Sequence, residues 1–206
     1  MNVKRLLRLE KEFLEKYPYG FDSYEMQRIK KKHNLEKLVN YIHDVCSIEN
    51  LKRGIEVFPD VAKVVGKSSM VSVFEKMRFR DTCADFDKVE KLEFLHSIYE
   101  LIHGDKRTGF DGLLNLLSPY KLAKWPLITV WRAYFYPEND VFIKPTTVKK
   151  VISYIELEDI VYTPAVNYEF YRKYKGYINE MKKVIKTESL KPNNQAFSGF
   201  LMMTII

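Results

Sequence analysis

The side chains that could perform metal, nucleophilic or acid–base chemistry in this chain are four histidines, two cysteines and a few paired carboxylates. A metal site needs such ligands at short spacings, as in H-E-x-x-H on one helix. His96 and His103 are seven residues apart, about two helical turns, which is too far for both to bind one ion. Cys46 and Cys83 lie outside any Cys/His spacing typical of zinc. The sequence therefore predicts no metal site and no bound cofactor.

Motifs that bind phosphate or activate a serine are also missing from the sequence. It contains neither G-x-G-x-x-G nor a Walker motif, and it has no G-x-S-x-G turn. Asp85 and Asp87 precede a strong helical pattern, where carboxylates stabilise the positive end of a helix. We expect these carboxylates to be structural, and the residue patterns leave open whether the protein is an enzyme.

The residues that could bind a polyanion are concentrated between Ser118 and Val151. This stretch carries six Lys or Arg residues against Glu138 and Asp140, a net charge of +4 in a chain whose net charge is +7. Aromatic residues, including Trp125 and Trp131, lie between the cations and could stack on bases, although most of them are expected in the core. Five cations are the predicted phosphate contacts: Lys121, Lys124, Lys144, Lys149 and Lys150.

Helices must position these residues, because helical periodicity dominates the chain. Apolar residues recur at intervals of three and four along 85–103, and residues 127–135 are nearly all apolar, which predicts a buried helix. Pro145 fits the first turn of the next helix. Eight Gly and eight Pro are too few for the many turns of an all-β protein. We predict one all-α domain over 1–206, a compact bundle of about ten helices that divides, if at all, into lobes at 1–104 and 108–206.

The composition favours a protein of the cytoplasm. Two cysteines that are far apart suit a reducing compartment better than a disulfide framework. Residues 1–8 are charged and lack the apolar region of a signal peptide, and no apolar run reaches the roughly 20 residues that cross a bilayer. We therefore expect a cytoplasmic protein with a basic surface and no membrane partner.

The order of elements between residues 108 and 155 resembles the helix-hairpin-helix DNA glycosylase superfamily. A short apolar helix over 110–117 meets the turn Ser118-Pro119-Tyr120, and a buried helix leads to Pro145-Thr146-Thr147-Val148-Lys149-Lys150-Val151. This last segment is similar in spacing and character to the Asp-Thr-His-Val-x-Arg-Val segment of that family. The resemblance implies a glycosylase-like helical fold that contacts DNA.

Two departures from the family bear on its chemistry. The family's hairpin uses glycines so that backbone amides can approach a phosphate, and 117–124 contains none. Pro145 occupies the position of the catalytic aspartate and cannot act as an acid or a base, so we expect the glycosylase mechanism to be lost or moved. The segments Lys124-Trp125-Pro126-Leu127 and Phe142-Ile143-Lys144-Pro145 are also similar to K-W-P and F-L-K-P segments of a family of uncharacterised bacterial proteins. That second resemblance implies no activity.

Three functional hypotheses follow from the sequence. The first is a DNA-binding protein without glycosylase chemistry, in which the five lysines contact phosphates and the N-terminus of the helix at Pro145 assists. The second is a non-enzymatic helical module that binds another protein through exposed Tyr and Phe residues around 162–177. The third is an enzyme that acts on a nucleobase or nucleotide in a pocket near Trp125, Trp131 and Lys144, with Asp140 as its carboxylate.

Overall fold

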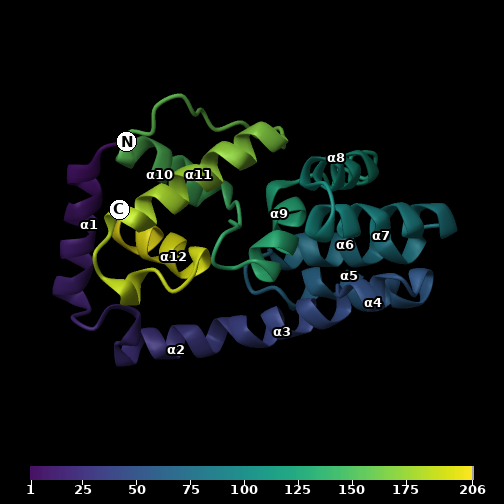
Figure 1. The fold of residues 1–206 in the computed structure, drawn as a ribbon, viewed down its shortest axis with the longest axis horizontal. Helices are drawn as coiled ribbons and strands as arrows, with labels where there is room; N and C mark the ends of the chain where they lie inside the picture. The colour runs from purple at the N-terminus through teal and green to yellow at the C-terminus, as the bar shows by residue number, and fades with distance from the viewer. Residues whose placement is uncertain (206) are drawn as a thin grey trace.

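The computed structural model describes residues 1–205, and these residues form helices and connecting segments without a β-strand (Figure 1). The predicted all-α class and compact multi-helix architecture are confirmed. The α-helices are α1 (Val3–Lys16), α2 (Tyr24–His33), α3 (Leu35–Val45), α4 (Ile48–Leu51), α5 (Phe58–Lys67), α6 (Val73–Asp85), α7 (Lys88–His103), α8 (Lys106–Leu117), α9 (Trp125–Phe135), α10 (Pro145–Ile155), α11 (Tyr168–Val184) and α12 (Asn194–Thr204). Three short 3-10 helices lie between them: η1 (Gly20–Asp22), η2 (Gly54–Val57) and η3 (Glu188–Leu190).

Local side-chain chemistry explains where many of these helices begin. The Asn2 side chain accepts a hydrogen bond from the backbone N–H of Arg5 at the start of α1. The Asp87 side chain accepts the backbone N–H of Glu90 at the start of α7 in the same way. The Glu90 carboxylate in turn accepts the backbone N–H of Asp87, which completes a capping box. Residues 48–58 do not form one continuous helix. Gly54 adopts a φ of +68° there, which ends α4 and separates it from η2 and α5.

The helices pack in two groups, which Figure 1 shows as the left and right halves of the molecule. The terminal group consists of α1, α2 and α10–α12, so it is built from both ends of the chain, whereas the central group consists of α3–α9. In the terminal group α1 packs against α10, α11 and α12. In the central group α9 packs against α3, α5, α7 and α8. A contact of α11 with α8 joins the two groups.

Polar contacts join α1 to the end of α10 and to the segment after α11 within the terminal group. The backbone N–H of Asn2 donates to the carbonyl of Ile155 at 2.7 Å, and Arg5 pairs with Glu156 at 2.9 Å, so α1 starts where α10 ends. Glu10 is buried, and its carboxylate accepts the backbone N–H groups of Lys186 and Thr187 at 3.0 and 2.8 Å. These contacts fix the position of α10 relative to α1 and α11.

Helices α7 and α8 make the closest helix contact in the central group. A Cβ atom at Gly109 would overlap the backbone of Leu101 and would lie 2.6 Å from the carbonyl oxygen of Ser97, so only glycine fits between the two backbones. The turn at 104–108, where the sequence suggests a division into lobes, therefore joins two helices that pack tightly on each other. None of the described helices is long and apolar enough to cross a bilayer.

Candidate nucleic-acid interface

The five lysines predicted as phosphate contacts lie on the surface. Lys121, Lys144, Lys149 and Lys150 are exposed, and Lys124 is half-buried. None of the five takes part in the ion pairs formed among the described residues, whereas the Arg side chains of the chain are mostly paired with carboxylates. Their positive charges are thus available to an external anion.

The structure holds the segment before Lys144 against α9, the helix that Lys124 precedes. Each directly precedes a helix, and no side chain caps the start of α9 or α10. Thr129, one turn into α9, donates its hydroxyl to the carbonyl of Trp125 at 2.7 Å and accepts the backbone N–H of Ile143 at 3.0 Å. Ile143, the residue before Lys144, is therefore held against the first turn of α9.

A chain of aromatic contacts connects Lys149 to the same place. The Lys149 ammonium lies 4.9 Å above the centre of the Tyr162 ring, a cation–π contact. The Tyr162 ring meets Phe170 at 5.9 Å, and Phe170 meets Trp125 at 5.1 Å between ring centres. The Trp125 indole N–H donates to the carbonyl of Thr163 at 2.9 Å, which holds the connecting segment against α9.

Lys150 lies on α10, and Lys121 lies in the turn that precedes α9. The buried residues of α10 include Thr147, Val148 and Val151, so Lys149 and Lys150 share the opposite, exposed face. Lys121 belongs to the turn between α8 and α9, where Arg78 donates to the carbonyl of Tyr120 at 3.1 Å. We call Lys124, Lys144, Lys149 and Lys150, whose segments these contacts connect, the basic surface, and Lys121 lies toward α6.

The predicted pocket residues lie in the core. Trp125 is 2 % exposed, and Trp131 and Asp140 are 0 % exposed. The Asp140 carboxylate accepts hydrogen bonds from Arg132 at 2.7 and 3.0 Å and from the hydroxyl of Tyr171, and it pairs with Lys175 at 3.1 Å. Arg132 also donates to the carbonyl of Leu101 at 2.6 Å. Asp140 therefore faces a satisfied internal network and no open pocket.

The network sets the ionisation of its own members. Burial alone would raise the pKa of Asp140, but hydrogen bonds from Arg132 and Tyr171 and the charges of Arg132 and Lys175 hold it below the usual carboxyl value. Burial and the adjacent carboxylate raise the pKa of Tyr171 well above that of an ordinary phenol. Asp140 is thus a permanent anion at neutral pH that neutralises Arg132, a structural role.

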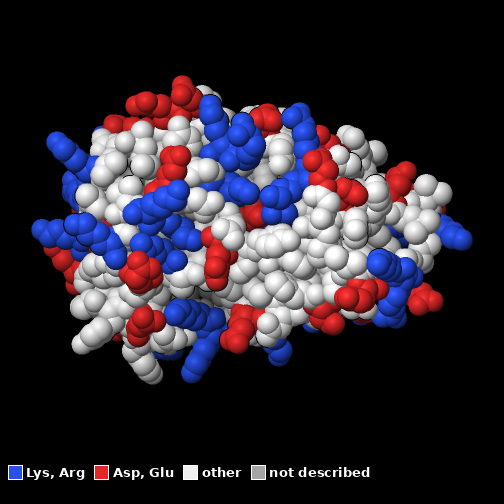
Figure 2. Space-filling model, in the orientation of Figure 1, with Lys and Arg blue, Asp and Glu red and all other residues white. Residues whose placement is uncertain are grey.

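Sequence reasoning missed the cations of α11. Figure 2 shows Lys and Arg gathering over the half of the molecule that holds α10–α12, along α11 in particular. Residues 168–186 carry six Lys or Arg against two Glu, the same ratio as the stretch around the five predicted lysines. The charges of this helix are visible in the sequence, but its many tyrosines dominate the pattern. The exposed cations on the outer face of α11 are Arg172, Lys173, Lys183 and Lys186.

The expected exposed aromatic surface over 162–177 is wrong. Phe170, Tyr171 and Tyr174 are buried, and the remaining tyrosines of this stretch are half-buried. The reason is the helical spacing, because positions 170, 171, 174 and 178 form the face of α11 that packs inward.

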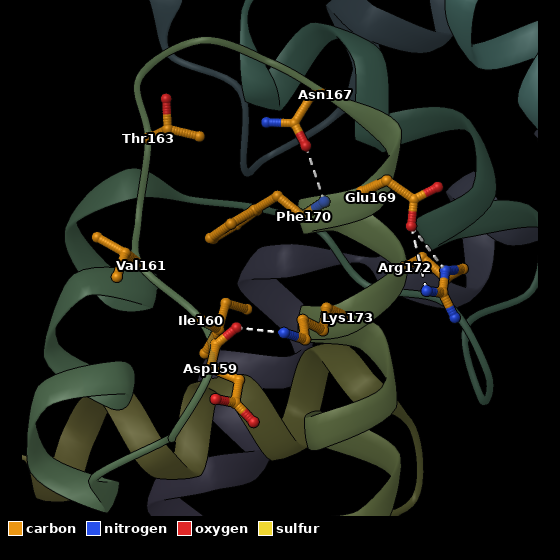
Figure 3. A pocket seen from close by; sticks show the side chains of 9 residues that line it. All are labelled: Asp159, Ile160, Val161, Thr163, Asn167, Glu169, Phe170, Arg172 and Lys173. Atoms are coloured by element: carbon orange, nitrogen blue, oxygen red, sulfur yellow. Dashed lines mark hydrogen bonds and ion pairs between the residues drawn. The ribbon is translucent and has the colours of Figure 1, made fainter.

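A shallow pocket of about 350 Å³ lies between the segment after α10 and the first turns of α11 (Figure 3). Its charged residues engage one another. Glu169 pairs with Arg172 at 3.1 Å and with Arg107 at 3.1 Å, and Lys173 donates to the carbonyl of Asp159. The second cavity lies between α7 and α8 and is lined by Glu90, Glu93 and His96 among others. Neither cavity is lined by a member of the basic surface.

Comparison with known proteins adds no relative. No family model, no curated protein and no solved structure matches this chain. The candidate site therefore rests on its own geometry.

Two of the histidines make structural hydrogen bonds, and both cysteines are buried. His103 bonds to the carbonyl of Cys46 at 2.8 Å, and His43 to the carbonyl of Phe135 at 2.7 Å. Burial raises the pKa of Cys46, and it raises that of Cys83 to about 12, so neither thiol ionises readily. Among residues 1–205 no three His, Cys, Asp or Glu side chains come together as metal ligands.

Proposed function

We propose that this protein binds DNA through the basic surface of Lys124, Lys144, Lys149 and Lys150, without glycosylase chemistry. The observation that carries the proposal is the hydrogen bond that holds the segment before Lys144 against the first turn of α9, which follows Lys124. None of the lysines at 124 and 144–150 forms an ion pair among the described residues. Such lysines release counterions when they contact phosphates, which is the main source of non-specific DNA affinity.

The start of α10 supports the same proposal. Pro145 has no N–H and its φ suits the first turn, so the helix starts here without a side-chain cap. Lys144 and Thr146 are exposed beside this positive end of the helix dipole. A phosphate placed there would meet a cation and the free amides of the first turn. The terminal group as a whole favours anions, since residues 1–34 and 136–206 carry 19 Lys and Arg against 13 Asp and Glu.

The same geometry argues against base excision by the glycosylase mechanism. Pro145 holds the position that resembles the family's catalytic aspartate, and the nearest buried carboxylate, Asp140, is held by Arg132, Tyr171 and Lys175. A carboxylate that is 0 % exposed and already neutralised cannot reach a flipped base. The proposed function is therefore binding alone.

Fluorescence anisotropy with a labelled DNA duplex at two salt concentrations tests the proposal. The triple variant Lys144→Glu, Lys149→Glu, Lys150→Glu should weaken binding by about tenfold or more and should lower the slope of log K against log salt by about three. The matched control reverses three exposed, unpaired lysines of the central group, Lys37→Glu, Lys52→Glu and Lys88→Glu. Both triples change the net charge from +7 to +1, so a general charge effect would weaken them equally.

Three results would count against the proposal. Undetectable binding of the wild-type chain at low salt would remove it. Equal losses of DNA affinity in the two triple variants would show that binding depends on net charge and not on a specific surface. Release of a damaged or normal base from the duplex would show chemistry that the proposal excludes.

A further inference from the structure

A groove between α7 and α8 in the central group has a chemical character opposite to that of the basic surface. It encloses about 540 Å³ and contains no Lys or Arg among its lining residues. Glu90 and Glu93 line it, and Asp85 and Asp87 precede them at the start of α7. None of these four carboxylates takes part in the ion pairs among the described residues. The remaining lining residues are His96, Ser97, Gly112, Asn115, Leu116, Pro119 and Tyr120.

Apolar side chains flank the acidic groove without a partner. Val89 is 60 % exposed and Leu92 is 44 % exposed. Val89 is four residues before Glu93, and Leu92 is four residues before His96, so the helical spacing places them next to lining residues on the same side of α7. Lys91 lies on another side of the helix, where its ammonium is 5.8 Å from the centre of the Phe58 ring.

Phe74 extends the apolar rim onto α6. Its side chain is 64 % exposed, and the Arg78 guanidinium lies 5.9 Å from the centre of its ring. Arg78 also donates to the carbonyl of Tyr120, whose hydroxyl bonds to Glu90 within the groove. Three exposed apolar side chains therefore lie on the helices next to the groove, in which Glu93 forms no ion pair among the described residues.

We propose that this groove is a docking site for a basic amphipathic helix of a partner protein. Cations on such a helix would pair with Glu90 and Glu93, and its apolar side chains would cover Val89, Leu92 and Phe74. The apolar rim is the reason for choosing a helix over a small amine, since an amine would leave these side chains in water. From Val89 to His96 the groove extends about 10 Å, which matches two turns of a helix. This inference is independent of the proposed DNA binding.

A synthetic probe tests the docking site directly. The probe is a labelled amphipathic peptide of Leu and Lys, about 14 residues or four helical turns long. Its comparison peptide replaces each Leu with Ser and keeps the charge. The wild-type chain should bind the Leu/Lys peptide about tenfold or more tightly than the Ser/Lys peptide, because the apolar rim contributes only to the former.

The variant Val89→Ser, Glu93→Lys should weaken binding of the Leu/Lys peptide by about tenfold or more. The matched control is Ile48→Ser, Glu49→Lys on α4, where an exposed apolar residue also lies beside an exposed, unpaired glutamate. Circular dichroism and the urea midpoint establish that both variants fold. In the wild-type chain, amide resonances of α7 and α8 should shift on titration with the peptide, a measurement that needs no variant.

Equal binding by the two variants, or equal binding of the two peptides, would overturn the proposal. So would peptide-induced shifts confined to α10 and α11. A concentration-dependent dimer in sedimentation velocity that the groove variant dissociates would assign the groove to a second copy of this chain, and would likewise overturn it.

Discussion

The terminal and central groups differ in how they use charge. Residues 1–34 and 136–206 carry six more cations than anions, whereas residues 35–135 carry 15 Lys and Arg against 14 Asp and Glu. The basic surface lies where α10 of the terminal group meets the start of α9, and the acidic groove lies between α7 and α8 of the central group. The net charge of +7 is therefore the sum over a positively charged surface and a negatively charged one. Charge placement, more than net charge, is the clue to what each group binds.

The two groups also depend on one buried junction. Arg132 of α9 reaches the carbonyl of Leu101 in the central group, and its partner Asp140 is held by Tyr171 and Lys175 of α11 in the terminal group. Asp140 is four residues before Lys144, so the junction fixes the segment that leads to the basic surface. The predictions below test whether the two groups act as one unit.

The largest expected effect comes from breaking the junction. Arg132→Ala should lower the free energy of unfolding by about 3–5 kcal/mol, because it leaves Asp140 buried without its main counter-ion. Urea denaturation measures the loss. The matched control is Arg80→Ala, which removes an exposed pair with Asp81 at 2.8 Å and should cost less than about 1 kcal/mol. Similar losses in both variants would show that the junction does not hold the groups together.

A smaller effect is expected from the helix contact inside the central group. Gly109→Ala should destabilise the protein by about 1–3 kcal/mol, because the new methyl group overlaps the backbone of Leu101. Gly66→Ala on α5 is the control. A Cβ there meets nothing within 4 Å, so that variant should gain about 0.4–1 kcal/mol. A neutral or stabilising Gly109→Ala would mean that α7 and α8 can separate.

Protonation of Asp140 should contribute to the loss of stability at acid pH. The folded protein holds the pKa of Asp140 below its unfolded value, so its contribution is present above the unfolded pKa, near 4, and is lost as the pH falls through the folded pKa. Each pKa unit between the folded and unfolded values of Asp140 corresponds to about 1.4 kcal/mol of unfolding free energy. Unfolding free energies between about pH 5 and 2 should therefore fall less steeply for Asp140→Asn than for the wild type. Asp81→Asn, at an exposed position, should follow the wild-type slope.

The smallest signal concerns the thiols, which both belong to the central group. Cys46 and Cys83 are buried, and neither should react with a thiol reagent in the folded protein. In a urea titration their labelling should begin at the same concentration at which the helical circular dichroism is lost. Labelling at lower urea would show that the central group opens before the terminal group, which would contradict a single cooperative unit.

The helices themselves follow from short spacings in the sequence. The recurrence of apolar residues along α7, the cap at Asn2 and Pro145 at the first turn of α10 involve residues within about four positions of each other, and all three agree with the structure. The break between α4 and α5 was not predicted, because a lone glycine is also tolerated inside a helix and its presence does not show that the chain adopts a positive φ there.

The sequence by itself determined the all-helical class, the surface positions of the lysines and the burial of the helix over 127–135. Only the tertiary structure decided that the segment before Lys144 is held against the first turn of α9, that Asp140 pairs with Arg132, and that Glu90 and Glu93 line a groove with residues of α8. The physical reason is the range of the interactions. A helix is specified by neighbours one turn away, but a binding surface is assembled from segments whose contacts depend on how whole helices pack.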